Sequence, residues 1–195
     1  MSQSHEIGDV AGELPPPLRL AVAYAPASAR PGWTALLALD QRLARAVAGA
    51  SEPLIGQLKL AWWRDRTREP ASAWPRGEPL LAALAPFDGE RAALEALVDA
   101  WEAQIDADGD PAYLAQLAQA RGRAVAALAR MLGCADDPDT IAGHARRWTD
   151  RGAWPVAPRL SRAMRPLAIL ANLPAPDEFG PLALLRIVRL GMLGR

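Results

Sequence analysis

The chain has 195 residues, of which 51% are hydrophobic, and its 22 Lys and Arg balance 22 Asp and Glu. This length suits one domain whose core needs no disulfide or metal to hold it together. Zero net charge argues against a general nucleic-acid binder, because phosphate contacts need an excess of basic side chains. The single Cys134 excludes an intrachain disulfide framework and a cysteine-based zinc cluster. We find no secretory signal at the start and no uncharged apolar run long enough to span a bilayer, so we expect a cytoplasmic protein.

Eighteen prolines and 15 glycines divide the chain at intervals of about one helix. Between them, apolar residues recur at spacings of three and four, and no stretch alternates with period two. We therefore expect an all-α fold, a compact single-domain array of eight or nine helices. These helices are expected over residues 31–48, 53–62, 79–85, 89–105, 111–132, 138–148, 160–173 and 182–193. Residues 1–17 are polar and then proline-rich, which predicts a flexible segment before a helical domain over 18–195.

Several helix ends are predicted from residue type. Asp88 is expected to cap the helix after it, and Asp110 is expected to cap the next, with Pro111 at its first position. Gly133 is expected to end that helix, and Pro166 is expected to kink or split the segment over 160–173.

Two adjacent tryptophans occupy the helix predicted over 53–62 and just beyond it. Trp62 continues an apolar stripe through Ile55 and Leu58, so we place it in the core. Trp63 falls about 100° away on the helix, where it could line a hydrophobic ligand site or pack against another helix.

An acidic stripe follows one face of the helix over 89–105. Its members are Glu95, Asp99, Glu102 and Asp106. Carboxylates one turn apart can reach one Mg²⁺ ion or its waters, but the stripe also suits the solvated face of an amphipathic helix. We prefer the solvated face and predict no metal site. His144, between Ile141 and Trp148, is expected to be a packed histidine rather than a ligand.

Basic residues supply the other candidate chemistry. Arg121 interrupts an apolar stripe, so it is expected either in an internal ion pair or facing a bound anion. Arg42 and Arg45 share one side of a helix, and Lys59 and Arg64 lie on the next one. If those two helices form a hairpin, the four cations could converge; otherwise they form a solvated basic face.

Several segments resemble the squalene/phytoene synthase superfamily, and most of all its short bacterial phytoene-synthase-like members. The segments are LAVAYAP at residues 20–26, the helix over 33–47, EPLIGQLKLAWWRD at 52–65, LVDAW at 97–101, QARGRAV at 119–125 and GHA at 143–145. Of these, LAWWRD is the most specific. The resemblance implies a trans-prenyl synthase fold, here truncated, in which two aspartate-rich motifs hold Mg²⁺ and neutralise a prenyl diphosphate as it ionises.

The sequence departs from that pattern at both motifs. The first reads LDQRLARAVA at 39–48, with Arg42 and Arg45 about where acids are expected and only Asp40 left. The second reads RRWTDRG at 146–152, where Asp150 is the one carboxylate. The resemblance therefore implies a catalytically degenerate protein that needs no Mg²⁺ and acts in isoprenoid or lipid binding or as an assembly scaffold.

Two other functions remain open. One is an active prenyl transferase that uses Mg²⁺ and atypical carboxylates from Glu95, Asp99 or Asp65. The other is a peripheral membrane adaptor whose basic, apolar helix over 182–193 contacts the bilayer. The candidate ligand-binding residues are Arg42, Arg45, Lys59, Trp63, Arg64 and Arg121, and the expected partners are a prenyl diphosphate, a lipid or another protein.

Overall fold

The computed structural model describes residues 10–48, 53–105, 107, 110–151 and 158–173. These residues form helices and no strands, so the prediction of an all-α fold is confirmed. The α-helices are α2 (Pro16–Ala23), α3 (Arg30–Ala48), α4 (Pro53–Arg68), α5 (Pro79–Leu84), α6 (Arg91–Glu102), α7 (Pro111–Met131), α8 (Pro138–Asp150) and α9 (Arg165–Leu170). Three short 3-10 helices accompany them: η1 (Ala71–Ala73), η2 (Ala85–Glu90) and η3 (Arg162–Met164). Within the described ranges, no helix is both long and apolar enough to cross a bilayer.

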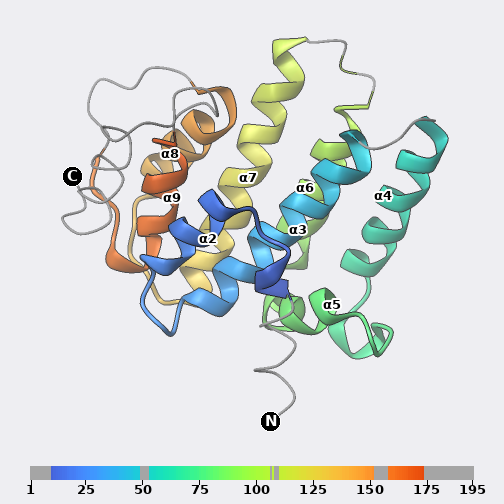
Figure 1. Cartoon of the computed structure of the whole chain (residues 1–195), viewed down its shortest axis with the longest axis horizontal. Coiled ribbons are helices and arrows are strands. Elements are labelled where there is room, and N and C mark those ends of the chain that lie inside the picture. Colours follow the sequence, from blue (N-terminus) through green and yellow to red (C-terminus); the bar gives the residue numbers. More distant parts are fainter. Residues whose placement is uncertain (1–9, 49–52, 106, 108–109, 152–157, 174–195) are drawn as a thin grey trace.

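Helix α3 is the centre of the fold. It packs against α2, α4, α5, α6 and α7, and Figure 1 shows it in the middle of the molecule, between α4 at one edge and α8 and α9 at the other. Trp33 is fully buried on α3, and its indole nitrogen donates a hydrogen bond of 2.8 Å to the carbonyl oxygen of Ala163 in η3. This bond joins the central helix to the last described part of the chain.

Small residues bring α7 and α8 close together. A Cβ atom added at Gly122 would lie 3.5 Å from the Cα of Ala142 and 3.6 Å from the Cβ of Ala145. The high alanine content of the chain therefore has a packing role here, because short side chains let two helix backbones approach each other.

The helix ends agree with the sequence in part. Asp110 accepts a hydrogen bond of 2.8 Å from the backbone nitrogen of Ala112, and α7 ends just before Gly133, whose φ is 66°. The expectation for Asp88 is wrong, since this residue lies inside η2 and α6 begins only at Arg91. Its carboxylate instead accepts a hydrogen bond of 2.7 Å from Ala71, which holds η1 against η2.

The segment over 160–173 is split as Pro166 predicts. The 3-10 helix η3 precedes α9, and Pro166 lies in the first turn of α9, where a missing backbone N–H leaves no intrahelical bond unmade. The helix predicted over 182–193 lies outside the described residues.

Residues 10–17 differ from the loosely attached segment expected for them. Val10 and Leu14 are 1% and 3% exposed and belong to the hydrophobic core. Their spacing of four residues places both on one side of a helical turn, and burial of this pair anchors the segment.

Helix α4 faces the core with the opposite side from the one predicted. Trp63 is 6% exposed, whereas Trp62 is 40% exposed. The buried face is formed by Gly56, Leu60, Trp63 and Thr67. The apolar stripe that was predicted to be core points outward instead. The sequence could not decide between the two faces because both carry large apolar residues at helical spacing.

Candidate functional site

A surface pocket of about 300 Å³ lies between α3 and α4. It is lined by Arg42, Arg45 and Ala46 of α3, Lys59 and Trp63 of α4, and Glu13 of the N-terminal segment. Four of the six candidate residues are therefore brought together, because α3 and α4 pack against each other with Arg42, Arg45, Lys59 and Trp63 on their adjoining sides. Arg64 and Arg121 do not line this pocket.

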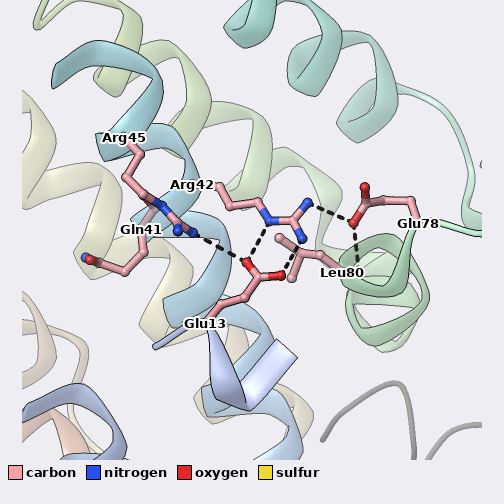
Figure 2. A network of polar contacts seen from close by, with 6 residues as sticks. All are labelled: Glu13, Gln41, Arg42, Arg45, Glu78 and Leu80. Carbon is pink, nitrogen blue, oxygen red and sulfur yellow. Dashed lines mark hydrogen bonds and ion pairs between the residues drawn. The ribbon is translucent and has the colours of Figure 1, made fainter. Parts of the chain in front are cut away.

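Glu13 is the residue of this pocket that the sequence reasoning missed. Arg42 donates to it twice, from Nη2 to Oε1 at 2.7 Å and from Nε to Oε2 at 3.0 Å. Arg45 reaches the same carboxylate at 3.4 Å (Figure 2). The hydrogen bond from Arg42 holds the pKa of Glu13 below its ordinary value, and the charges of both arginines act in the same direction.

Arg42 is also fixed from the opposite side. Its Nη1 donates to Glu78 Oε1 at 2.8 Å, and the same oxygen accepts a hydrogen bond from the backbone nitrogen of Leu80 at the start of α5 (Figure 2). The guanidinium carbon lies 5.9 Å from the ring centroid of Trp63. The hydrogen bond to Glu13 is the largest cause that raises the pKa of Arg42, and the charge of Glu78 acts in the same direction, so the guanidinium is a permanent, oriented cation.

Lys59 differs from the two arginines. It is exposed on α4 and has no acidic partner within ion-pair distance among the described residues. The pocket therefore offers one cation to an incoming anion directly and two more that already hold a carboxylate.

The acidic stripe of α6 faces α4 rather than solvent alone. Arg64 donates to Asp99 Oδ1 at 2.7 Å and also forms an ion pair with Glu102, while Arg68 donates to Glu95 Oε1 at 2.6 Å. Arginines from the neighbouring helix thus neutralise three of the four acids, and Asp106 lies outside the described residues. Arg64, predicted to bind substrate, is engaged here by Asp99 and Glu102.

Arg121 forms the internal ion pair that the sequence left as one of two alternatives. It grips Asp40 with two hydrogen bonds, Nε to Oδ1 at 3.0 Å and Nη2 to Oδ2 at 2.9 Å. Asp40 also accepts a bond of 2.9 Å from the indole nitrogen of Trp101, and its side chain is only 2% exposed. The guanidinium carbon of Arg121 lies 4.3 Å from the ring centroid of Trp148, so aromatic rings enclose the pair.

A comparison with models of known protein families shows which family this chain belongs to. The model of the squalene/phytoene synthase family matches residues 18–148, well over half of the sequence. The chain belongs to the squalene/phytoene synthase family. The family match includes both helices that form the pocket and the whole of the Asp40–Arg121 pair. Searches of curated proteins and of solved structures find no match to this chain.

The squalene/phytoene synthase family implies Mg²⁺ bound by clustered carboxylates, and the residues described here do not fit that ion. Within these ranges, no group of three or more His, Cys, Asp and Glu side chains converges in a way that could hold a metal. Asp40, the acid remaining in the first motif, already accepts three hydrogen bonds from Arg121 and Trp101. A carboxylate engaged by a guanidinium has few lone pairs left for a cation.

His144 occupies the packed position expected for it. It is 2% exposed, and its Nε2 donates to the carbonyl oxygen of Pro158 at 3.0 Å. Burial lowers the pKa of His144, and the nearby charge of Arg147 lowers it further, against an opposing effect of the Pro158 bond.

Proposed function

We propose that this member of the squalene/phytoene synthase family does not catalyse prenyl transfer and instead binds an anionic isoprenoid or lipid headgroup. The pocket between α3 and α4 is the observation that supports this function. Arg42, Arg45 and Lys59 surround one space of about 300 Å³, and Trp63 forms an apolar wall beside them. This volume is at the lower end of the range for small-molecule sites, which suits a headgroup better than a whole prenyl chain.

The bound carboxylate of Glu13 illustrates the chemistry that the pocket offers. A guanidinium presents parallel N–H donors that match two oxygens of a carboxylate or a phosphate. A diphosphate that displaced Glu13 would meet the same donors of Arg42 and Arg45, with Lys59 as a third cation. The pocket therefore suits a doubly charged anion better than a neutral ligand.

The state of the acids weighs against catalysis. An allylic diphosphate ionises readily when metal ions neutralise its leaving group, and those ions need free carboxylates. Asp40 is bound to Arg121, and the atypical acids Glu95 and Asp99 are bound to Arg68 and Arg64. Holding a diphosphate without activating it is binding rather than synthesis.

The test is calorimetric titration of the full chain with farnesyl diphosphate in the absence of metal. The double substitution Arg42→Glu with Arg45→Glu reverses two charges. It is expected to weaken binding by at least about tenfold, because two charge-assisted contacts are lost. The control carries Arg123→Glu and Arg130→Glu on α7. It changes the net charge by the same amount as the pocket variant and replaces no residue that lines the pocket.

Equal affinities of both variants, or no binding by the natural chain, would contradict the pocket as a ligand site. The protein would then be a scaffold for a protein partner. Its location, in the cytoplasm or at the periphery of a membrane, is part of the same proposal.

A further inference from the structure

Arg42 is held by two carboxylates that differ in how they are themselves attached. Glu78 Oε1 accepts a hydrogen bond from Arg42 at 2.8 Å and another from the backbone nitrogen of Leu80 at 3.2 Å, so this carboxylate also caps the start of α5. Within the described ranges, the Glu13 carboxylate is bound by Arg42 and Arg45 alone (Figure 2). Removing Glu78 from Arg42 would therefore also cost a helix cap, whereas removing Glu13 would not.

Glu13 belongs to a short turn over residues 10–14, the N-terminal turn. The side chains of Val10 and Leu14 anchor this turn in the core. Its backbone hydrogen bonds are longer than average, 3.2 Å from the nitrogen of Glu13 to the oxygen of Val10 and 3.3 Å from Leu14 to Ala11. A segment with two such bonds and two apolar anchors belongs to the parts of a fold that open most readily, and Glu13 supplies its polar contact with α3.

We propose that the N-terminal turn is a built-in occupant of the pocket, which a diphosphate displaces. The ligand replaces Glu13 on Arg42 and Arg45, Glu78 keeps Arg42 in place, and the N-terminal turn is loosened as a result. This movement rests on the proposed function, since it needs an anion in the pocket, but an anion can bind there without it.

Charge and geometry favour the exchange of Glu13 for a diphosphate. Arg42 donates to Glu13 from two nitrogens, Nη2 at 2.7 Å and Nε at 3.0 Å, and the same pair of donors matches two oxygens of a phosphate group. Glu13 brings one negative charge, whereas a diphosphate brings more than one and can also meet Lys59, which lines the same pocket. Because 33% of the Glu13 side chain is already exposed, the carboxylate can pass directly into solvent.

Displacement of Glu13 and opening of the N-terminal turn are reciprocal. The factor by which a bound anion raises the opening equilibrium of the turn equals the factor by which opening raises the affinity for that anion. An ion pair that remains partly exposed strengthens an attachment by up to about fivefold, and the two-armed grip of Arg42 belongs at the upper end of that range. We therefore expect a coupling of about threefold to fivefold.

Hydrogen–deuterium exchange of the purified chain, with and without inorganic pyrophosphate, measures this coupling, and calorimetry measures the affinity. Pyrophosphate is expected to speed amide exchange over the N-terminal turn by about threefold to fivefold. Exchange over α5, whose start is capped by Glu78, is expected not to become faster. A ligand ordinarily stabilises the folded state and slows exchange, so faster exchange confined to the N-terminal turn is specific to displacement.

Two glutamate variants show whether the carboxylate of Glu13 carries the effect. Glu13→Gln is expected to speed exchange over the N-terminal turn without ligand and to tighten pyrophosphate binding by about threefold to fivefold. Added pyrophosphate should then cause no further acceleration. The matched control is Glu90→Gln, because Glu90 forms a similar pair with Arg130, at 2.9 and 2.6 Å, away from the pocket. The control is expected to change neither quantity.

The outcomes separate this movement from the function of the pocket. Pyrophosphate binding with unchanged or slower exchange over the N-terminal turn would overturn the displacement and leave the pocket as a ligand site. Faster exchange over α5 instead would also overturn it, because Glu78 would then be the carboxylate that leaves. Absence of pyrophosphate binding, even by Glu13→Gln, would contradict the proposed function and the displacement together.

Discussion

Replacing Asp40→Asn tests whether the acid of the first motif is a structural ion-pair partner. The substitution removes one negative charge while keeping the size and one acceptor oxygen of the side chain. Arg121 is then left as a cation with 11% of its side chain exposed and no counter-charge in its two hydrogen bonds. Because the pair is enclosed by Trp101 and Trp148, solvent can compensate little of that loss.

The expected effect is large for a single substitution. Breaking a buried ion pair from one side costs about 3–5 kcal/mol, and asparagine should fall near 3 kcal/mol because it still accepts one bond. For a chain of this size, each kcal/mol lowers the melting temperature by about 2–4 °C, so the midpoint should fall by about 6–12 °C. Replacing both partners, Asp40→Leu with Arg121→Met, should destabilise the fold less than Asp40→Asn alone, since no buried charge remains unpaired.

Thermal and urea unfolding of the natural chain and these variants measure the effect, and each series is repeated with Mg²⁺. Our interpretation predicts no stabilisation by Mg²⁺, because a ligand raises stability only where the folded state binds it. A loss below about 1 kcal/mol for Asp40→Asn would contradict the ion-pair account. A rise in midpoint with Mg²⁺ that disappears in Asp40→Asn would identify Asp40 as a metal ligand instead.

Three further predictions concern the pocket, the core and the pH dependence. Glu13→Gln should strengthen farnesyl diphosphate binding severalfold in calorimetry, because the ligand no longer competes with a resident carboxylate; weaker binding would contradict this. Trp63→Ala should cost about 3–5 kcal/mol in urea unfolding and Trp62→Ala about 1 kcal/mol or less, and the reverse order would refute the observed orientation of α4. Burial lowers the pKa of His144 in the folded chain. As the pH falls below about 6.5, the unfolded chain therefore binds a proton before the folded chain does, and the free energy of unfolding should decrease. His144→Gln should flatten that decrease, and an unchanged slope would assign it to other groups.

Apart from α2, which the sequence did not predict, the described helices lie close to their predicted places because local chemistry determines them. Asp110 caps α7, Gly133 follows its end with a positive φ, and Pro166 lies in the first turn of α9, each through a backbone requirement that its residue type meets. Asp88 shows the limit of such reasoning, since its carboxylate serves Ala71, a partner 17 residues earlier in the chain.

The orientation of α4 and the composition of the pocket depend on tertiary contacts that no local pattern contains. Trp62 and Trp63 lie on two apolar faces of one helix, and only packing against α3 and α6 selects which is buried. Glu13 could have been suspected from Val10 and Leu14, whose spacing predicts an anchored helical turn around it. The approach of Arg42, Arg45 and Lys59 was predicted from a hairpin of two helices, whereas the contact between Glu13 and Arg42 depends on where the N-terminal segment packs.

Release of pyrophosphate tests the central claim most directly. The purified chain is incubated with geranylgeranyl or farnesyl diphosphate and Mg²⁺, and pyrophosphate is measured against a blank without protein. A non-catalytic member of the squalene/phytoene synthase family should give the rate of the blank, both as the natural chain and as Asp99→Asn. Mg²⁺-dependent release by the natural chain that Asp99→Asn abolishes would contradict the account and show an active prenyl transferase.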